Sequence, residues 1–180
     1  SINDSLEYLK NKYGSFLNIF SYFVNIGTIA DSSWSSRLVG FCTDKQNNEV
    51  FGSVESVFPS VDNIEKELSQ AFSHYRHYFP TMPVPSVYTC ITGFNNSIIT
   101  GDSVLGIGLD RYLGSGSDYY RRLEIYKYLA DRMTPENIVP DCIYGWGSSE
   151  WQFSDLRYQA DIVLSEMMHE GKLKYFEKCM

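Results

Sequence analysis

The sequence contains few of the residues from which metal sites and nucleophilic sites are usually built. Its 180 residues include only three histidines, its four cysteines form no CxxC pair, and it has no GxSxG motif. Local motifs therefore indicate neither a zinc knuckle, nor the disulfide framework of a small secreted domain, nor a nucleophile elbow. The four cysteines lie far apart along the chain, which leaves their redox state open.

Positive charge and long hydrophobic runs are also scarce. The formal net charge is −7, from 22 acidic and 15 basic residues, and the isoelectric point is about 4.9. Nucleic-acid binding needs a dense set of Lys and Arg side chains, so we expect no nucleic-acid partner. No apolar run reaches the roughly 18 residues that indicate a membrane span. The most hydrophobic segment, residues 16–29, is interrupted by polar residues and is typical of a buried helix.

Aromatic residues, in contrast, are abundant. They make up 16% of the chain, including 14 Tyr and 11 Phe. The simplest interpretation is a core built from rings whose hydroxyl groups reach the surface, and the alternative is an exposed ring surface that binds a sugar or a peptide. The length suits one domain with a proper core, and no repeat or linker divides it. We therefore expect residues 1–180 to form a single domain.

Most of the chain has the apolar periodicity of helices. The pattern predicts polar loops at 44–48, 115–118 and 145–149, and a stiff extended connector at Pro80, Pro83 and Pro85. Asp4, Asp31, Ser60 and Thr134 stand where helix-capping residues are expected. The predicted helices cover residues 5–13, 15–25, about 34–41, 50–58, 61–79, 118–132, two short pieces after 134, and 154–180.

Residues 87–114 are the only long segment with β character. Its short strands are separated by turn-type dipeptides at 95–96 and 101–102. In residues 104–109 Leu and Ile alternate with Val and Gly, so one face is apolar and the other nearly bare. A bare glycine face usually lets another backbone, a helix or a ligand come close. The sequence therefore predicts an α+β fold, mostly helical, with a small antiparallel sheet at about 86–113.

The last predicted helix, residues 154–180, carries two apolar stripes about 180° apart. A helix that is apolar on both sides is expected to be sandwiched and central to the fold. His169 lies within the second stripe and is flanked by Glu166 and Glu170. Both stripes still run at Met180, where no capping glycine follows, and we expect a C-terminal part of the protein to lie beyond it.

His169 and Glu170 begin an HExxL sequence that is close to the zinc-peptidase motif HExxH. The motif needs two histidines one helical turn apart, with the glutamate between them as general base, and Leu173 occupies the second position. A structural histidine is the simpler interpretation. Glu166 and His169 also form half of a di-iron motif, but the chain has no second copy.

Several blocks of sequence resemble one family, the gliding-motility lipoprotein GldB family of Bacteroidetes. They follow the family's order over nearly the whole chain: 88–95 (YTCITGFN), 105–114 (LGIGLDRYLG), 133–136 (MTPE), 139–141 (VPD) and 166–176 (EMMHEGKLKYF). The resemblance implies a cell-envelope lipoprotein, facing the periplasm or the cell surface. It also implies a leader and a lipid-bearing cysteine upstream of Ser1, which would anchor the protein to a membrane.

The same family is similar to predicted zinc-dependent proteases with a zincin-like fold, in which the HExxH helix lies under an edge strand. By that likeness residues 104–109 would be the edge strand, and Leu173 departs from the motif. Our main hypothesis is a non-catalytic zincin-like domain without a cofactor. It would bind an envelope protein or peptide in a cleft between edge strand and last helix, lined by Asn95, Asp110, Tyr112, Glu166 and His169.

Three alternatives remain at the level of sequence. Asp110 and Tyr112 could serve local structure, with the carboxylate bonded to nearby backbone and the ring in the core. A zinc-dependent metallopeptidase with a degenerate motif would use His169 and Glu170 as metal-site residues. A glycan-binding module would need an exposed cluster of rings.

Overall fold

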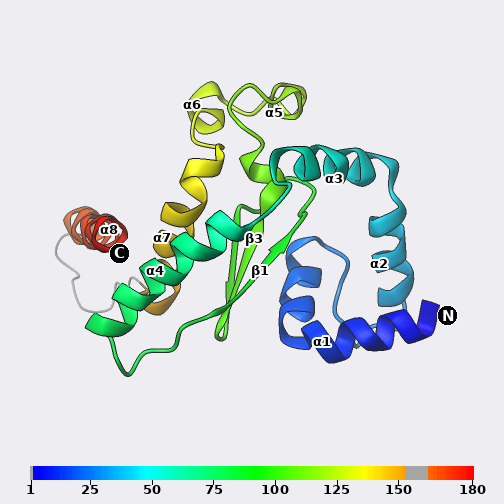
Figure 1. Ribbon diagram of the computed structural model, residues 1–180, viewed down its shortest axis with the longest axis horizontal. Helices are drawn as coiled ribbons and strands as arrows, with labels where there is room; N and C mark the ends of the chain where they lie inside the picture. The colour runs from blue at the N-terminus through cyan, green and yellow to red at the C-terminus, as the bar shows by residue number, and fades with distance from the viewer. Residues whose placement is uncertain (1, 153–161) are drawn as a thin grey trace.

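The computed structural model describes residues 2–152 and 162–180, and most of these residues are helical (Figure 1). A three-stranded sheet lies in the middle of the chain, which confirms the predicted α+β class. Four helices precede the sheet: α1 (Ile2–Phe23), α2 (Trp34–Thr43), α3 (Lys45–Val57) and α4 (Asp62–Tyr78). The strands are β1 (Ser86–Cys90), β2 (Ile98–Gly101) and β3 (Val104–Gly108). After them come η1 (Leu109–Tyr112), α5 (Asp118–Arg122), α6 (Lys127–Ala130), η2 (Pro135–Asn137), α7 (Ile138–Glu150) and α8 (Ile162–Cys179).

The strand order is β1-β3-β2, so β3 is the central strand. β2 pairs with β3 antiparallel through a tight turn, whereas β1 pairs with β3 parallel, with Ser86 opposite Val104 and Cys90 opposite Gly108. The predicted all-antiparallel sheet is therefore wrong at the β1–β3 pair. The expectation that residues 104–109 form an edge strand is also wrong. The chain crosses from β1 to the far side of the sheet before it returns, and β3 then fills the gap between the first two strands.

The glycines of β3 admit other parts of the same chain. A Cβ atom on Gly106 would lie 2.8 Å from the ring of Phe16 on α1, and one on Gly108 would collide with the carbonyl oxygen of Asn96. The prediction that the bare face brings another element close is confirmed. The element is helix α1 at one glycine and the 92–97 loop at the other.

Two apolar clusters cover the two faces of the sheet. On the glycine face α1 and α2 contribute Phe16, Phe20, Trp34 and Leu38, and the Trp34 indole N–H donates to the hydroxyl of buried Ser21 at 2.9 Å. On the other face β3 packs against α4 and α7. The cluster on this face contains Leu105 and Ile107 of β3, Leu68 and Phe72 of α4, and Ile138 and Ile143 of α7. Many of the rings are buried in these clusters, as the aromatic-core interpretation predicted, while the exposed rings are spread over several helices.

α1 consists of two helical segments that meet at a kink, where Tyr13 is non-helical (φ −124°, ψ 18°), so the predicted break between the first two helices is confirmed within one residue (Figure 1). Two other helix boundaries differ from the sequence predictions for identifiable reasons. α3 begins inside the predicted 44–48 loop, because the Asp44 carboxylate caps it by accepting the Asn47 N–H at 2.9 Å. α7 continues through the predicted 145–149 loop, where Gly145 and Gly147 serve packing instead of a turn.

The remaining predicted helices after the sheet also differ in part. The helix predicted for 118–132 is divided into α5 and α6, with Glu124 at a positive φ of 54° between them. Pro140 lies in the first turn of α7, where proline is tolerated, so α7 is not divided into two pieces. The predicted start of the last helix at 154 lies outside the described residues.

α8 packs against α7, which lies between α8 and the sheet (Figure 1). Its buried side chains Leu173 and Phe176 pack on Gly147 of α7. Val163 and Met167 of the other stripe are 67% and 66% exposed. Over residues 162–180 the prediction of a sandwiched, central helix is therefore wrong. Across the described ranges, no helix combines the length and the apolar character needed to cross a membrane.

Candidate functional site

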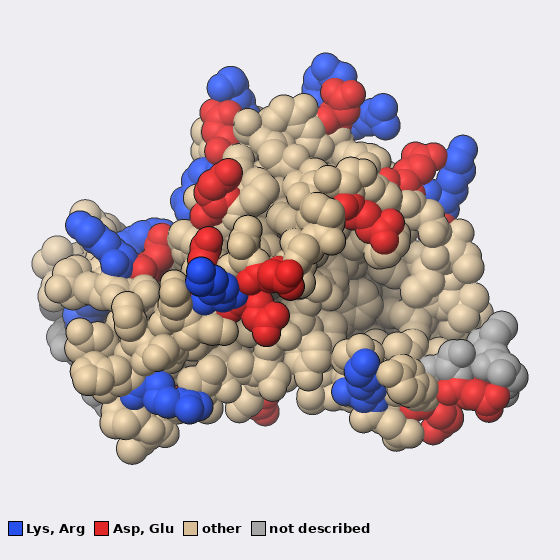
Figure 2. Space-filling model, in the orientation of Figure 1, with Lys and Arg blue, Asp and Glu red and all other residues tan. Residues whose placement is uncertain are grey.

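An apolar recess lies beside β1 on the described surface. We call it the α2–α3 recess. Its volume is about 420 Å³, and it lies where β1 faces the ends of α1, α2 and α3. Its apolar lining includes Phe20, Phe41, Phe51, Val54, Ile91 and Leu109, and its polar lining consists of Cys42, Asn47, Asn48, Thr89 and Cys90. No lining residue is charged, and Figure 2 shows the recess as an uncharged hollow between α3 and α1.

A second cavity of about 460 Å³, which we call the α4 groove, lies on the face of β1 that α4 covers. Its apolar walls are formed by Ile64, Leu68, Phe72, Val84, Val87 and Ile107. Glu65 is its one charged lining residue. Thr89 borders both cavities, so the two hollows meet at β1.

Asp110, a predicted site residue, is fully buried at the end of β3 and holds the 92–97 loop in place. Its carboxylate accepts the backbone N–H groups of Thr92 (3.1 Å) and Phe94 (2.5 Å) and the Thr92 hydroxyl (3.2 Å). Gly93 and Phe94 have positive φ values of 66° and 64°, which turn the N–H groups inward as in an anion-binding nest. Burial raises the pKa of Asp110, and these hydrogen bonds oppose that rise.

Asn95 and Arg111 complete this loop. The Asn95 side-chain amide donates to the Thr92 carbonyl at 3.0 Å, and the Arg111 guanidinium donates to the Phe94 carbonyl at 3.2 Å. The structure therefore brings Asn95 and Asp110 together, as parts of one turn. The Asp110 carboxylate bonds to nearby backbone, which is the local role that the sequence analysis gave as an alternative.

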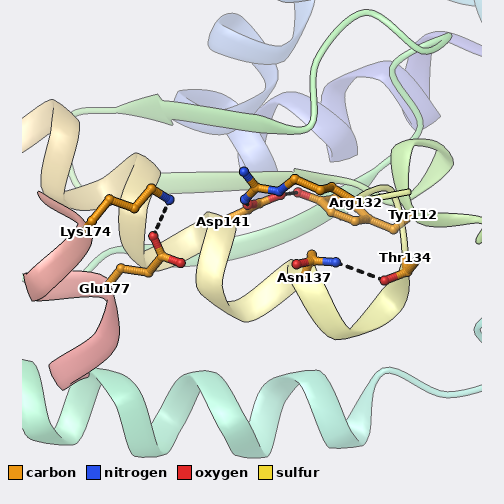
Figure 3. A network of polar contacts seen from close by, with 7 residues as sticks. All are labelled: Tyr112, Arg132, Thr134, Asn137, Asp141, Lys174 and Glu177. Carbon is orange, nitrogen blue, oxygen red and sulfur yellow. Dashed lines mark hydrogen bonds and ion pairs between the residues drawn. The ribbon is translucent and has the colours of Figure 1, made fainter. Parts of the chain in front are cut away.

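Tyr112 is buried and points away from that loop, toward α7. Its hydroxyl donates to Asp141 at 2.9 Å, and the same carboxylate accepts from Arg132 at 3.3 Å (Figure 3). On α8, Lys174 pairs with Glu177 beside this network. Burial raises the pKa of Asp141, whereas the Tyr112 hydrogen bond and the Arg132 charge lower it. The network joins η1, the segment before η2, and α7.

The hydrogen bond from Tyr112 stabilises the charged form of Asp141, so its removal has a predictable direction. We expect Tyr112→Phe to raise the pKa of Asp141, because burial then acts with one hydrogen bond fewer to oppose it. The side-chain carboxyl carbon of Asp141, followed by NMR through a pH titration, measures the shift. Tyr128→Phe is the control, since that exposed ring is 69% accessible and should leave the titration of Asp141 unchanged. A lower pKa in Tyr112→Phe would contradict the prediction.

The last two predicted site residues, Glu166 and His169, lie on α8 and are separated from Asn95 and Asp110 by α7. Glu166 is exposed. His169 is half-buried in a third cavity, whose lining also includes Phe79, Glu150, Trp151, Lys172 and Phe176. The five predicted residues therefore do not line one cleft. Within residues 2–152 and 162–180, no three His, Cys, Asp or Glu side chains gather as metal ligands.

Two cysteines line the α2–α3 recess, and neither has the properties of a reactive thiolate. Burial raises the pKa of Cys42, and burial together with the Asp110 charge raises the pKa of Cys90 to about 12. Cys42, Cys90, Cys142 and Cys179 are all free thiols. Both pKa shifts favour the protonated thiol, which is the less nucleophilic form of cysteine.

The family profile described as gliding motility protein GldB matches residues 1–180. The chain belongs to the GldB family. This assignment confirms the family resemblance and supports a gliding-motility-associated lipoprotein. No curated protein and no solved structure matches the chain.

Sequence reasoning missed β1 and the two cavities that border it in this GldB-family protein. A partial signal was present. In residues 87–90 Val and Thr alternate with Tyr and Cys, as in a strand with two different faces. Tyr88 stacks on Phe16 of α1 with ring centroids 4.6 Å apart, whereas Val87 and Thr89 face the cavities. The pattern predicts two faces, but it cannot identify which edge of the strand stays unpaired.

Proposed function

We propose that this GldB-family protein is a lipoprotein of the cell envelope, associated with gliding motility, that acts by binding a partner protein or peptide and does not catalyse a reaction. The observation that carries the proposal is the uncharged apolar α2–α3 recess beside β1. Buried cores of protein interfaces are similarly poor in charge and rich in aromatic residues. Binding at this recess replaces the cleft between residues 104–109 and the last helix that the sequence suggested.

The chemistry around the recess supports binding over catalysis. Asp110 directly follows Leu109 of the recess lining, and its buried carboxylate is already engaged by three hydrogen-bond donors from the 92–97 loop. A general base must be able to reach a substrate proton, and this carboxylate is enclosed. The relationship to zincin-like proteases stays a prediction from resemblance, and binding at the recess does not depend on it.

Site-specific photo-cross-linking tests the binding site in cells that make the full-length protein. The cross-linking residue replaces Phe51, which borders the α2–α3 recess and is 50% exposed. We expect one discrete adduct from this position, with the cross-linked peptide identified by mass spectrometry. The matched control is Tyr126, directly before α6, which is 71% exposed and lines neither cavity. Equal adducts from both positions, or none from position 51, would contradict the proposed site.

Metal analysis tests the competing metallopeptidase hypothesis. The protein is purified without added zinc, and its zinc content is compared with that of His169→Ala. We expect no zinc that depends on His169, because the second histidine position of the motif is Leu173. One equivalent of zinc that is lost in His169→Ala would overturn the non-catalytic proposal.

A further inference from the structure

The outer edge of β1 carries backbone groups that point away from the sheet. In a parallel pair, alternate residues of a strand direct both N–H and C=O toward the partner strand. Ser86 faces β3, since its N–H donates to the Ser103 carbonyl at 2.9 Å. By this alternation Tyr88 and Cys90 also face β3, and the backbone groups of Val87 and Thr89 point outward. In the part of the chain that the structure describes, no hydrogen bond engages these outward groups.

This edge lacks the devices that usually protect an edge strand from pairing. Natural edges carry lysine, inward-pointing charges, proline or a bulge. The five residues of β1 are Ser, Val, Tyr, Thr and Cys, with no charge and no proline among them, and their pairing with β3 is continuous. Val87 is 37% exposed, and Thr89 is also exposed. A β-prone strand therefore presents an open edge to solvent.

The two cavities are placed where the side chains of an added strand would go. Val87 borders the α4 groove, and Thr89 borders both the α4 groove and the α2–α3 recess. Side chains two residues apart on a strand are about 7 Å apart and point to the same face. A strand paired with β1 would thus direct successive same-face side chains toward two adjoining apolar cavities.

The charge of the surroundings restricts the composition of such a strand. Glu65 is the one charged residue in the lining of either cavity, and the chain carries a net charge of −7. An apolar segment with a basic residue opposite Glu65 complements this surface, whereas an acidic segment is repelled.

From these observations we propose that β1 is a docking strand, on which an extended segment of a partner protein adds a fourth strand to the sheet. The segment hydrogen-bonds to the backbone of Val87 and Thr89, places apolar side chains in the two cavities, and carries a basic residue near Glu65. This is strand addition to an open sheet edge. It rests on the proposed function and specifies its mode of binding.

Amide hydrogen exchange of the free protein tests the open edge directly. We expect the amides of Val87 and Thr89 to exchange about a hundredfold or more faster than those of Tyr88 and Cys90, because only the latter are bonded within the sheet. Equal protection of all four amides would overturn the proposal, since the outward groups would then already have partners.

A random dodecapeptide library displayed on phage, selected against the wild-type protein, tests binding. We expect the selected peptides to alternate apolar residues and to contain Lys or Arg. The selected peptides are then synthesised and their affinities are measured. Thr89→Pro removes an outward N–H and should lower the affinity for these peptides by about tenfold, which is the effect of one or two backbone hydrogen bonds. Thr89→Val keeps the N–H and is the matched control, expected to bind within about threefold of wild type.

Two further variants, together with a test of folding, separate the possible causes of a loss of peptide binding in Thr89→Pro. Thermal unfolding shows whether Thr89→Pro stays folded, as proline on the outward side of an edge strand usually allows. If Thr89→Pro does not stay folded, Val87→Lys replaces it as the test. This variant places a charge on the edge of β1 without removing an N–H, and it should lower the affinity for the peptides by a similar factor. Glu65→Gln should lower the affinity for peptides that contain Lys or Arg and leave the affinity for other peptides unchanged.

The outcomes distinguish this inference from the proposed function. If peptides bind the Thr89→Pro and Val87→Lys variants as tightly as wild type, strand addition is wrong, although a cross-link from position 51 would still support binding at the recess. If no peptide is selected, strand addition is likewise overturned. A concentration-dependent dimer that Thr89→Pro abolishes would assign the edge to a second copy of the chain and overturn the partner-protein proposal.

Discussion

Replacing Asp110 with alanine should destabilise the protein by about 3 kcal/mol, since buried N–H groups left without an acceptor cost about 1–3 kcal/mol. The change removes the acceptor of the Thr92 and Phe94 N–H groups and of the Thr92 hydroxyl. These donors are enclosed by the 92–97 loop, so water cannot replace the carboxylate without opening the loop. Urea denaturation, followed by circular dichroism, measures the free energy of unfolding.

Asp118→Ala is the matched control for this change. Asp118 pairs with Arg121 at 3.0 Å on the surface of α5, and its side chain is 65% accessible. Exposed ion pairs contribute about 0–1 kcal/mol, so the control should unfold close to the wild-type midpoint. If both variants lose the same stability, Asp110 does not hold the loop as the hydrogen bonds indicate.

Replacing Gly108 with alanine should cost about 3 kcal/mol, at the upper end of the range for overpacking a buried site. The new methyl group would collide with the carbonyl oxygen of Asn96 and lie 2.9 Å from Cγ2 of Thr92. Gly108 belongs to the central strand, so neither the strand nor the loop can move without disturbing the pairing with β1 and β2. The same urea titration provides the measurement.

Gly52→Ala provides a comparison of opposite sign. Gly52 lies inside α3, and a Cβ atom there would meet no other atom within 4 Å. Alanine is about 0.5–1 kcal/mol more favourable than glycine within a helix, so this variant should be more stable than the wild type. A Gly108→Ala variant as stable as Gly52→Ala would show that the 92–97 loop does not pack against β3 as described.

Sequence reasoning succeeded where structure is decided locally. The α4 helix was predicted at 61–79, and its inward residues Leu68, Ala71, Phe72 and Tyr75 are all buried, because helical periodicity depends on nearest neighbours along the chain. Gly145 and Gly147 were misjudged as a loop, because glycine at a packing contact and glycine in a turn look alike in a sequence. Only the ring of Phe176 against Gly147 shows which case applies.

In the candidate site, too, local features were predicted correctly and features set by tertiary packing were not. Asn95 and Asp110 were predicted together and do lie together, since they flank the β2–β3 hairpin, whose pairing brings its two ends side by side. Glu166 and His169 were placed with them because α8 was expected beneath the sheet. The partner of α8 depends on tertiary packing against Gly147, which no spacing in the sequence encodes. The open edge of β1 was missed for a related reason, because strand order is set by long-range pairing.

The strand order also affects how the chain folds. β2 and β3 are joined by two residues, so their hairpin closes a very short loop, whereas β1 reaches β3 only across the whole hairpin segment. Closing the longer loop costs more conformational entropy, and the hairpin should form before β1 joins it. The parallel β1–β3 pair is therefore the later and entropically costlier of the two pairings in the sheet.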